Sequence, residues 1–360
     1  MKNLYLVFVV LLLGATMNAQ NFKFGKVSKE EVESKAHPLN SDANVAVLYR
    51  EVIIYYNYDK NLGFVLITEV HERIKIYNKD GFDWATKEIG LYVSNNREEE
   101  VIEIKGETYN IENGKLVSQK LEKDGIFDEN ENKYRNRKKI TMPGIKEGSV
   151  IEYKYTITSP FLSSIDKIQL QYTIPIDNLE VTVKVPEYFI FKRHTNPKSQ
   201  LNFKIEESTN RISHTNTTTQ RSGFQVVQHS QETSKLEYVE NIYSIIKGDI
   251  PALKKEEYVD YLNNYAAVLN WELLYTKFPS GAIENYSENW DDVVNKIYNE
   301  NEFGKELKDT KYFTQDLAQV LDGVTMPQDK INTIFQFVKS KVKWNDYVGY
   351  FADYGVREAY

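Results

Sequence analysis

The chain has 360 residues, with 52 acidic and 45 basic side chains and a formal net charge of −7. This length is typical of about two or three domains. The absence of cysteine excludes disulfides, thiolate catalysis and zinc–thiolate sites. Because the sequence has no long basic block, nucleic acid is not expected as a partner.

The first residues have the pattern of a signal peptide. Lys2 supplies a positive charge, Leu4–Leu13 is an uncharged apolar run, and Ala19 ends a short stretch of small and polar residues. The apolar run is shorter than the roughly 20 residues that span a bilayer. Residues 1–19 are therefore predicted to be removed. We expect a protein exported to the periplasm or exterior of a Gram-negative bacterium, with no stable membrane anchor.

Residues 20–44 are predicted to form a linker that contains one short helix. The helix is predicted over the charged stretch Val27–His37, where Ser28 and Glu31 have the spacing of a capping box.

Residues 45–278 show almost only β-strand signals. Apolar and polar residues alternate in Ile151–Ile157, Ile168–Ile174 and Leu179–Val185, which predicts strands with one buried and one solvated face. In the first of these, the predicted solvated positions include Glu152 and Lys154. The turn-rich Pro175–Asn178 predicts a hairpin between the last two strands. We expect an antiparallel β-sandwich, and the sequence leaves open whether it forms one sandwich or two sub-sandwiches.

Three further turns are predicted within this region, at Asn78–Gly81, Glu112–Gly114 and Lys146–Gly148. Asn113-Gly114 suits a two-residue hairpin turn with positive φ.

Residues 279–360 change to a helical period. Asn289 is the expected N-cap of a helix that begins at Trp290, and further helices are predicted over Thr314–Leu321 and Pro327–Trp344. The last one carries an apolar stripe at helical spacing, formed by Ile331, Ile334, Phe335, Val338 and Val342. We expect this stripe to be a face that packs against a partner. Because Asn345–Tyr360 offers no other long apolar element, this domain is expected to be incomplete. The sequence does not show whether residue 360 is the natural end.

Candidate metal sites are weak. Asp128–Asn132 begins like a calcium loop, but Lys133 replaces its glycine and Lys139 replaces its glutamate, so a solvated acidic turn is expected. His71-Glu72 begins like a zinc-protease helix but lies in a β pattern without a second histidine. The five histidines are expected at the surface. They are His37, His71, His194, His214 and His229. Neither a metal nor a cofactor is predicted.

Carbohydrate chemistry is the remaining possibility raised by composition. The 26 tyrosines and several tryptophans could form sugar platforms. The candidates Trp84, Tyr109, Trp271 and Trp344 are expected to be core residues instead.

Four segments together resemble the bacterial domain of unknown function 3857, a secreted β-rich module that typically precedes a transglutaminase-like domain. They are Glu72–Ala85, Thr108–Lys115, Met142–Tyr153, and Pro251–Leu253 with Glu256–Tyr258. The resemblance implies that residues 279–360 are the start of a transglutaminase-like α+β domain. Such enzymes use a Cys nucleophile with His and Asp, and the resemblance places that Cys beyond the segment that ends at Tyr360. No catalytic, cofactor-binding or metal-binding residue is therefore assigned.

Three functions are consistent with these observations. The leading hypothesis is a non-catalytic binding or scaffolding module that contacts a protein or glycan at the cell envelope. The second is a fragment of a transglutaminase-like cysteine peptidase or acyl-transfer enzyme. The third is a carbohydrate-binding β-sandwich. The sequence gives neither the ligand nor the oligomeric state.

Overall fold

The computed structural model describes residues 22–59, 62–94, 96–219, 231–259, 261–286, 289–344, 352 and 354–360. The predicted signal peptide, residues 1–19, lies outside these ranges. Within the described part, no helix is both long enough and apolar enough to cross a membrane.

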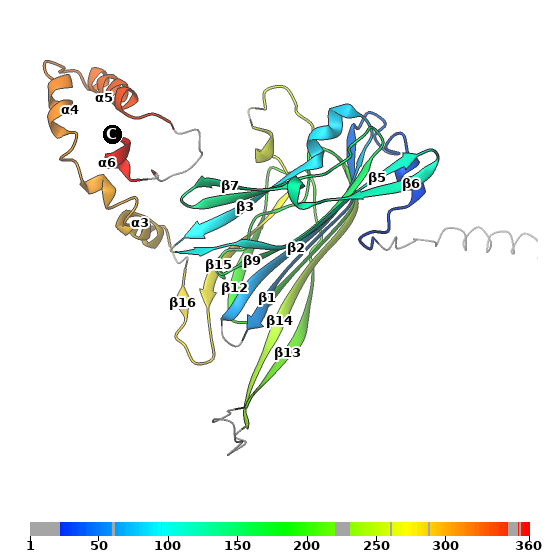
Figure 1. Ribbon diagram of the computed structural model, residues 1–360. Helices are drawn as coiled ribbons and strands as arrows, with labels where there is room; N and C mark the ends of the chain where they lie inside the picture. Colours follow the sequence, from blue (N-terminus) through cyan, green and yellow to red (C-terminus); the bar gives the residue numbers. More distant parts are fainter. Residues whose placement is uncertain are drawn as a thin grey trace, which may run out of the picture.

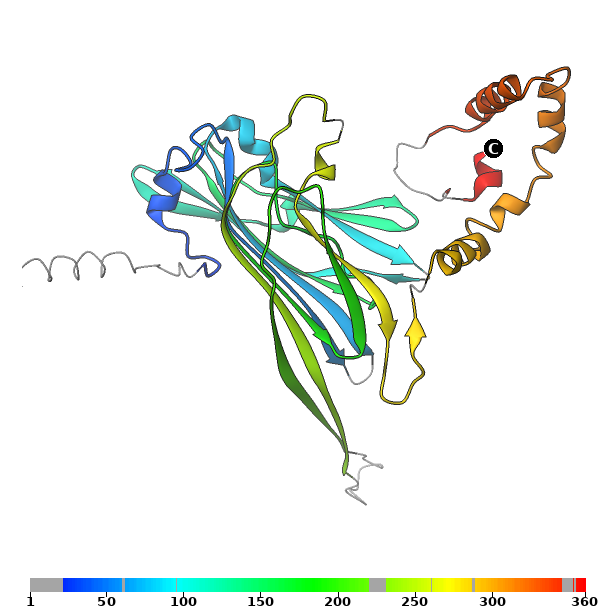
Figure 2. The ribbon, with the colours of Figure 1, turned by 180° about the vertical axis from the view of Figure 1, so that it is seen from behind.

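The largest sheet has eight strands in the order β13-β14-β11-β1-β2-β9-β5-β6 (Figure 1). Its strands are β1 (Val45–Asp59), β2 (Gly63–Ile76), β5 (Glu100–Glu112), β6 (Lys115–Lys120), β9 (Val150–Ser159), β11 (Ile176–Pro186), β13 (Glu206–Thr219) and β14 (Gln231–Ile250). The β13–β14 hairpin extends well away from the rest of the sheet in both views (Figures 1 and 2).

Two smaller sheets pack with the large one. In the first, β15 (Val268–Thr276) lies between β10 (Ile168–Gln169) and β12 (Phe189–Thr195) and also pairs with β16 (Glu284–Asn285). The second has the order β4 (Arg97–Glu98), β3 (Thr86–Ser94), β8 (Arg135–Thr141), β7 (Ile126–Asn132). One buried hydrophobic cluster joins side chains of all three sheets, including Ile74, Leu91 and Leu269. The main core therefore lies between one face of the large sheet and the two smaller sheets.

The expectation of a mainly β chain with a helical C-terminal region is confirmed, but two details are wrong. The sheets are not purely antiparallel, because β1 and β11 pair in parallel. The predicted hairpin across Pro175–Asn178 does not form, since β10 pairs with β15 while β11 pairs with β1 and β14. Beyond Gln169 the chain crosses the core: Leu170 is fully buried, and Tyr172 donates a hydrogen bond to Glu72. Its apolar alternation therefore reflects burial between the layers and not strand pairing.

The predicted local turns are present in the structure. Asn113 and Gly114 link β5 to β6 with φ of 51° and 74°, as a two-residue hairpin turn requires. Gly148 turns ahead of β9 with φ of 84°. Asn78 begins a 3-10 helix, η1 (Lys79–Ala85), by accepting a hydrogen bond from the Asp80 N–H. Two shorter 3-10 helices in the β region are η2 (Lys123–Gly125) and η3 (Leu262–Asn264).

The predicted helices form, although the one predicted over Val27–His37 is shorter and the one predicted over Pro327–Trp344 ends three residues before Trp344. Helix α2 (Lys29–Glu33) begins with the capping box of Ser28 and Glu31, and Asn289 caps α3 (Trp290–Asn299) by accepting from the Asp292 N–H. The remaining helices are η4 (Glu306–Lys308), α4 (Thr314–Val320), α5 (Pro327–Lys341) and α6 (Val356–Ala359).

Helices α3 to α5 form an arm beside the β sheets, drawn in orange and red in Figures 1 and 2. We call residues 289–344 the helical arm. It reaches the β7–β8 hairpin through Glu302, whose carboxylate contacts Tyr134 and Lys133. The predicted apolar stripe of α5 is present but exposed, from 37% at Ile334 to 61% at Ile331, and Phe337 is the buried side chain of this helix.

Candidate functional site

The N-terminal segment of residues 22–38, here called the strap, lies across the face of the large sheet that points away from the main core. Side chains of β2 alternate between the two faces, so that His71, Arg73 and Lys75 point toward the strap while Glu72 points into the core. The strap is drawn in blue beside β5 and β6 in Figure 1.

Glu152 of β9 is the centre of the contacts beneath the strap. Its carboxylate is fully buried and accepts hydrogen bonds from His71 Nε2 at 2.9 Å, Arg73 Nη2 at 2.8 Å and the Gly25 N–H at 2.8 Å. Burial alone would raise the pKa of Glu152, but the bonds from His71, Gly25 and Arg73 outweigh it and lower the pKa below its ordinary value. Arg73 also bonds the carboxylate of Glu31 at 2.9 Å. Charged side chains of the sheet thus hold the strap in place.

Lys75 holds the next part of the strap without a carboxylate partner. Its Nζ donates to the carbonyls of Val32 and Gly148, each at 2.6 Å, and the residue is fully buried. Burial lowers the pKa of Lys75 to about 8. Further along, His37 is buried and bonds the carboxylate of Asp177 at 2.6 Å.

A second buried polar cluster lies on the core side of the same strand. The Glu72 carboxylate bonds Arg50 and the hydroxyl of Tyr153, accepts from the Tyr172 hydroxyl at 2.8 Å, and lies 3.6 Å from the Lys87 ammonium. Three of these groups donate hydrogen bonds to the anion, and Arg50 and Lys87 bring positive charge beside it. The cluster therefore compensates a charge that would otherwise be costly to bury.

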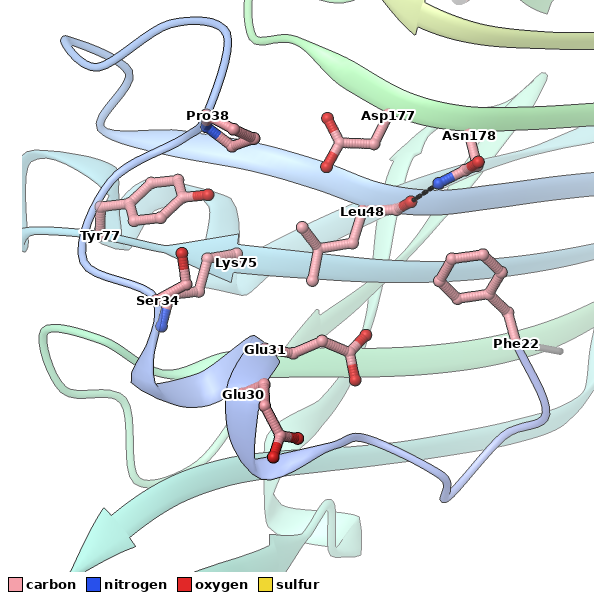
Figure 3. Close-up of a pocket in the computed structure, with 10 residues that line it drawn as sticks. All are labelled: Phe22, Glu30, Glu31, Ser34, Pro38, Leu48, Lys75, Tyr77, Asp177 and Asn178. Atoms are coloured by element: carbon pink, nitrogen blue, oxygen red, sulfur yellow. Dashed lines mark hydrogen bonds between the residues drawn. The ribbon is translucent and has the colours of Figure 1, made fainter. Parts of the chain in front are cut away.

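Two neighbouring pockets open between the strap and the sheet. The first has a volume of about 270 Å³ and is shown in Figure 3, where Phe22, Glu30 and Glu31 of the strap face Leu48 and Lys75 of the sheet. Asn178 forms one side by donating a hydrogen bond to the Leu48 carbonyl at 2.9 Å.

The second pocket shares Phe22 with the first and has a volume of about 380 Å³. We call it the strap pocket. It is lined by two aromatic rings and a tyrosine, by three basic side chains and by two carboxylates: Phe22, Phe24, Tyr49, Lys23, His71, Lys154, Glu51 and Glu180. The rings are ordered by stacking, with Phe22 parallel to Tyr49 at 4.4 Å between centroids and Phe24 at 5.9 Å from the His71 ring.

The two carboxylates of the strap pocket lie on adjacent strands, because Glu51 and Glu180 are register partners in the parallel β1–β11 pair. Burial and repulsion by Glu51 raise the pKa of Glu180, and a hydrogen bond from Tyr49 opposes this shift only in part. The pocket therefore combines a strained anionic pair, cations and apolar rings, a combination that can bind a small polar ligand.

The structure corrects several expectations about individual residues. His37 and His71 are buried and paired with carboxylates, not at the surface. His194 is a partly exposed neighbour of Glu272, His214 lies near the Tyr238 hydroxyl, and His229 is outside the described residues. The acidic stretch Asp128–Asn132 is part of strand β7, paired with β8, and not a turn. Among the described residues, no group of three or more His, Asp or Glu is placed to hold a metal.

Of the four aromatic candidates, three are used in packing. Tyr109 and Trp271 are buried, and Trp84 packs on the main core beside Tyr172. Trp344 is 72% exposed, so the expectation that it belongs to the core is wrong.

Sequence reasoning missed the strap pocket, because it treated Glu152 and Lys154 as a solvated face. Glu152 is covered by a segment 127 residues earlier in the chain. One signal was available: His71, Arg73 and Lys75 alternate in a strand, and a strand face this rich in cations calls for anionic partners.

The β region matches a known family. Residues 67–222 match the DUF3857 family model. That model is described as a domain of unknown function with a solved structure. The resemblance to domain of unknown function 3857 is thus confirmed for this stretch, which runs from β2 to beyond β13. Among proteins with curated functions, none matches the sequence.

A solved structure has a similar fold. The chain is similar to a crystal structure from Parabacteroides distasonis described as a "putative protease", with 13% identity and a TM-score of 0.51. This alignment covers 83% of the present chain and 51% of the other, so the chain spans about half the length of that protein. A leukotriene A4 hydrolase from yeast aligns over 77% of this chain and 35% of its own, with 11% identity and a TM-score of 0.27. The likeness to the Parabacteroides protein concerns the fold alone.

Proposed function

We propose that this chain is an exported, non-catalytic binding module of the bacterial envelope, and that the strap pocket is its ligand site. The observation that carries the proposal is the pocket itself, a space of about 380 Å³ lined by rings and by both signs of charge. The buried charges around it support a binding role. Glu152, His71, Arg73 and Lys75 are each engaged in contacts that hold the strap, and such contacts preorganise a pocket wall.

A thermal-shift screen of the mature chain, residues 20–360, with glycans and short peptides tests this function. A ligand of the strap pocket should raise the melting temperature of the unaltered chain and of V338D, which alters the exposed face of α5. It should not raise that of E51W or K154W, in which an indole fills the pocket. Two filling variants are used because either one could disturb the sheet. The proposal would be overturned if no compound raised the melting temperature, or if the rise persisted in both E51W and K154W. Peptide hydrolysis or crosslinking by the purified chain would overturn its non-catalytic part.

A second candidate is a piece of a transglutaminase-like enzyme, favoured by the helical arm. Trp290 of α3 is 83% exposed, and Phe335 of α5 is 59% exposed. Apolar faces of this kind normally pack on further protein. Reading the genomic DNA past codon 360 tests this candidate. An in-frame continuation with a cysteine at the start of a helix supports it, and an immediate stop codon contradicts it.

A further inference from the structure

The strap pocket has a charge order that follows from strand register. Glu180, Glu51, His71 and Lys154 are successive register partners on β11, β1, β2 and β9. Neighbouring strands lie about 4.8 Å apart, so the Cα atoms of Glu51 and Lys154 are separated by roughly 10 Å across the pocket floor. The floor is anionic at one end and cationic at the other.

The anionic end lacks a counter-charge. Among the described residues, neither Glu51 nor Glu180 forms an ion pair, and the contact they share is with Tyr49. Two adjacent carboxylates in a half-buried place repel each other and favour a cation between them. An ammonium group that donates hydrogen bonds to both carboxylates would supply the missing counter-charge.

Lys154 of β9 forms the cationic end of the floor, and its Nζ lies 3.3 Å from the Glu69 carboxylate of β2. Lys23 of the strap is a further cation of the pocket lining. Phe22 and Phe24 of the strap form the apolar part of the lining. A ligand that spans the floor therefore needs a cation and an anion a few ångströms apart on a short chain.

We infer that the strap pocket binds a dipeptide as a zwitterion, with its α-ammonium group at Glu51 and Glu180 and its α-carboxylate toward Lys154. An extended dipeptide is at most about 7 Å long. Side chains that lean inward from Cα atoms roughly 10 Å apart can therefore contact both of its ends. This inference rests on the proposed function, because it names the ligand class of the same pocket.

Isothermal titration of the mature chain with glycylglycine tests the inference. Glycylglycine should bind, while N-acetylglycylglycine, which lacks the ammonium, and glycylglycinamide, which lacks the carboxylate, should each bind at least about tenfold more weakly. E180Q should weaken glycylglycine at least about tenfold. The matched control E206Q, on β13 of the same sheet, should leave the affinity unchanged because Glu206 pairs with Lys204 away from the pocket.

The outcomes separate the two proposals. Equal affinity for glycylglycine and the blocked peptides would overturn the zwitterion inference but not the binding function. The same holds if glycylglycine does not bind while another ligand of the screen binds the unaltered chain and fails to bind E51W and K154W. No binding of any ligand in the strap pocket overturns both.

Discussion

At the scale of single residues, the charged side chains of β2 belong to the interior. His71 and Arg73 share the Glu152 carboxylate under the strap, and Glu72 forms its own cluster within the main core. Buried charges of this kind are tolerable only while every partner is present, since one missing partner leaves an uncompensated charge. The strand is therefore sensitive to small chemical changes that preserve shape.

The Glu152→Gln substitution should be strongly destabilising. It removes the fully buried one of the two carboxylates that Arg73 binds, and breaking a buried pair costs about 3–5 kcal/mol. Urea unfolding followed by circular dichroism measures the loss, with E206Q as a control expected to change the free energy of unfolding by less than about 0.5 kcal/mol. Equal stability of the two variants would mean that the Glu152 contacts contribute little.

Lys75 should make the free energy of unfolding depend on pH. Burial lowers the pKa of Lys75 in the folded chain from its ordinary value of 10.5 to about 8. The unfolded state therefore binds more protons between pH 8 and 10.5, and the contribution of this site to stability rises with pH across that window and is constant below it. The difference in unfolding free energy between the unaltered chain and K75M, measured from pH 7 to 9.5, should show this rise. A flat difference would contradict it.

At the scale of elements, local chemistry decides the turns and caps while distant contacts decide the pairing. The capping box of Ser28 and Glu31 starts α2 within four residues, yet this short helix is held by Val32 in a small cluster with Tyr109 and Val150. The β5–β6 hairpin depends on Gly114, whose φ of 74° favours glycine.

The Gly114→Ala substitution should destabilise the hairpin by about 1 kcal/mol, because alanine is strained at positive φ. Gly90 of β3 is the matched control: an added Cβ meets nothing at either position, and Gly90 does not have positive φ. We expect hydrogen exchange in β5 and β6 to be faster in G114A than in the unaltered chain, and to be unchanged in G90A. Similar exchange in both variants would show that the turn tolerates alanine.

At the scale of the whole molecule, the chain combines a β region with a well-packed core and a helical arm with exposed apolar faces. The core unites three sheets, whereas α3 has no buried side chain and α5 has one, Phe337. Exposed apolar area on this scale marks a surface for association.

The Phe335→Asp substitution should lower binding of the dye ANS and any self-association of the chain, while leaving the unfolding of the β region unchanged. The matched control is F127D on β7, where the ring is 47% exposed but lies outside the arm. Dye fluorescence and analytical ultracentrifugation measure the effect. An equal loss in both variants would show that the arm is not the main apolar surface.

Features under the control of local chemistry could be predicted from the residues alone. Alternation placed β9 and β11, Asn113-Gly114 set a hairpin, Asn289 began α3, and the missing cysteine excluded thiolate chemistry. The strands, the hairpin and the helix start depend on residues within a few positions of one another, and the absence of cysteine is a matter of composition.

Three features appear in the tertiary structure alone: both faces of β2 and β9 are covered, β1 and β11 run in parallel, and His71 meets Glu152 across 81 residues. A strand with charges on one face has the same pattern whether water or another segment covers that face. The strap that covers it lies far away in the sequence, and so does every partner that makes those charges stable.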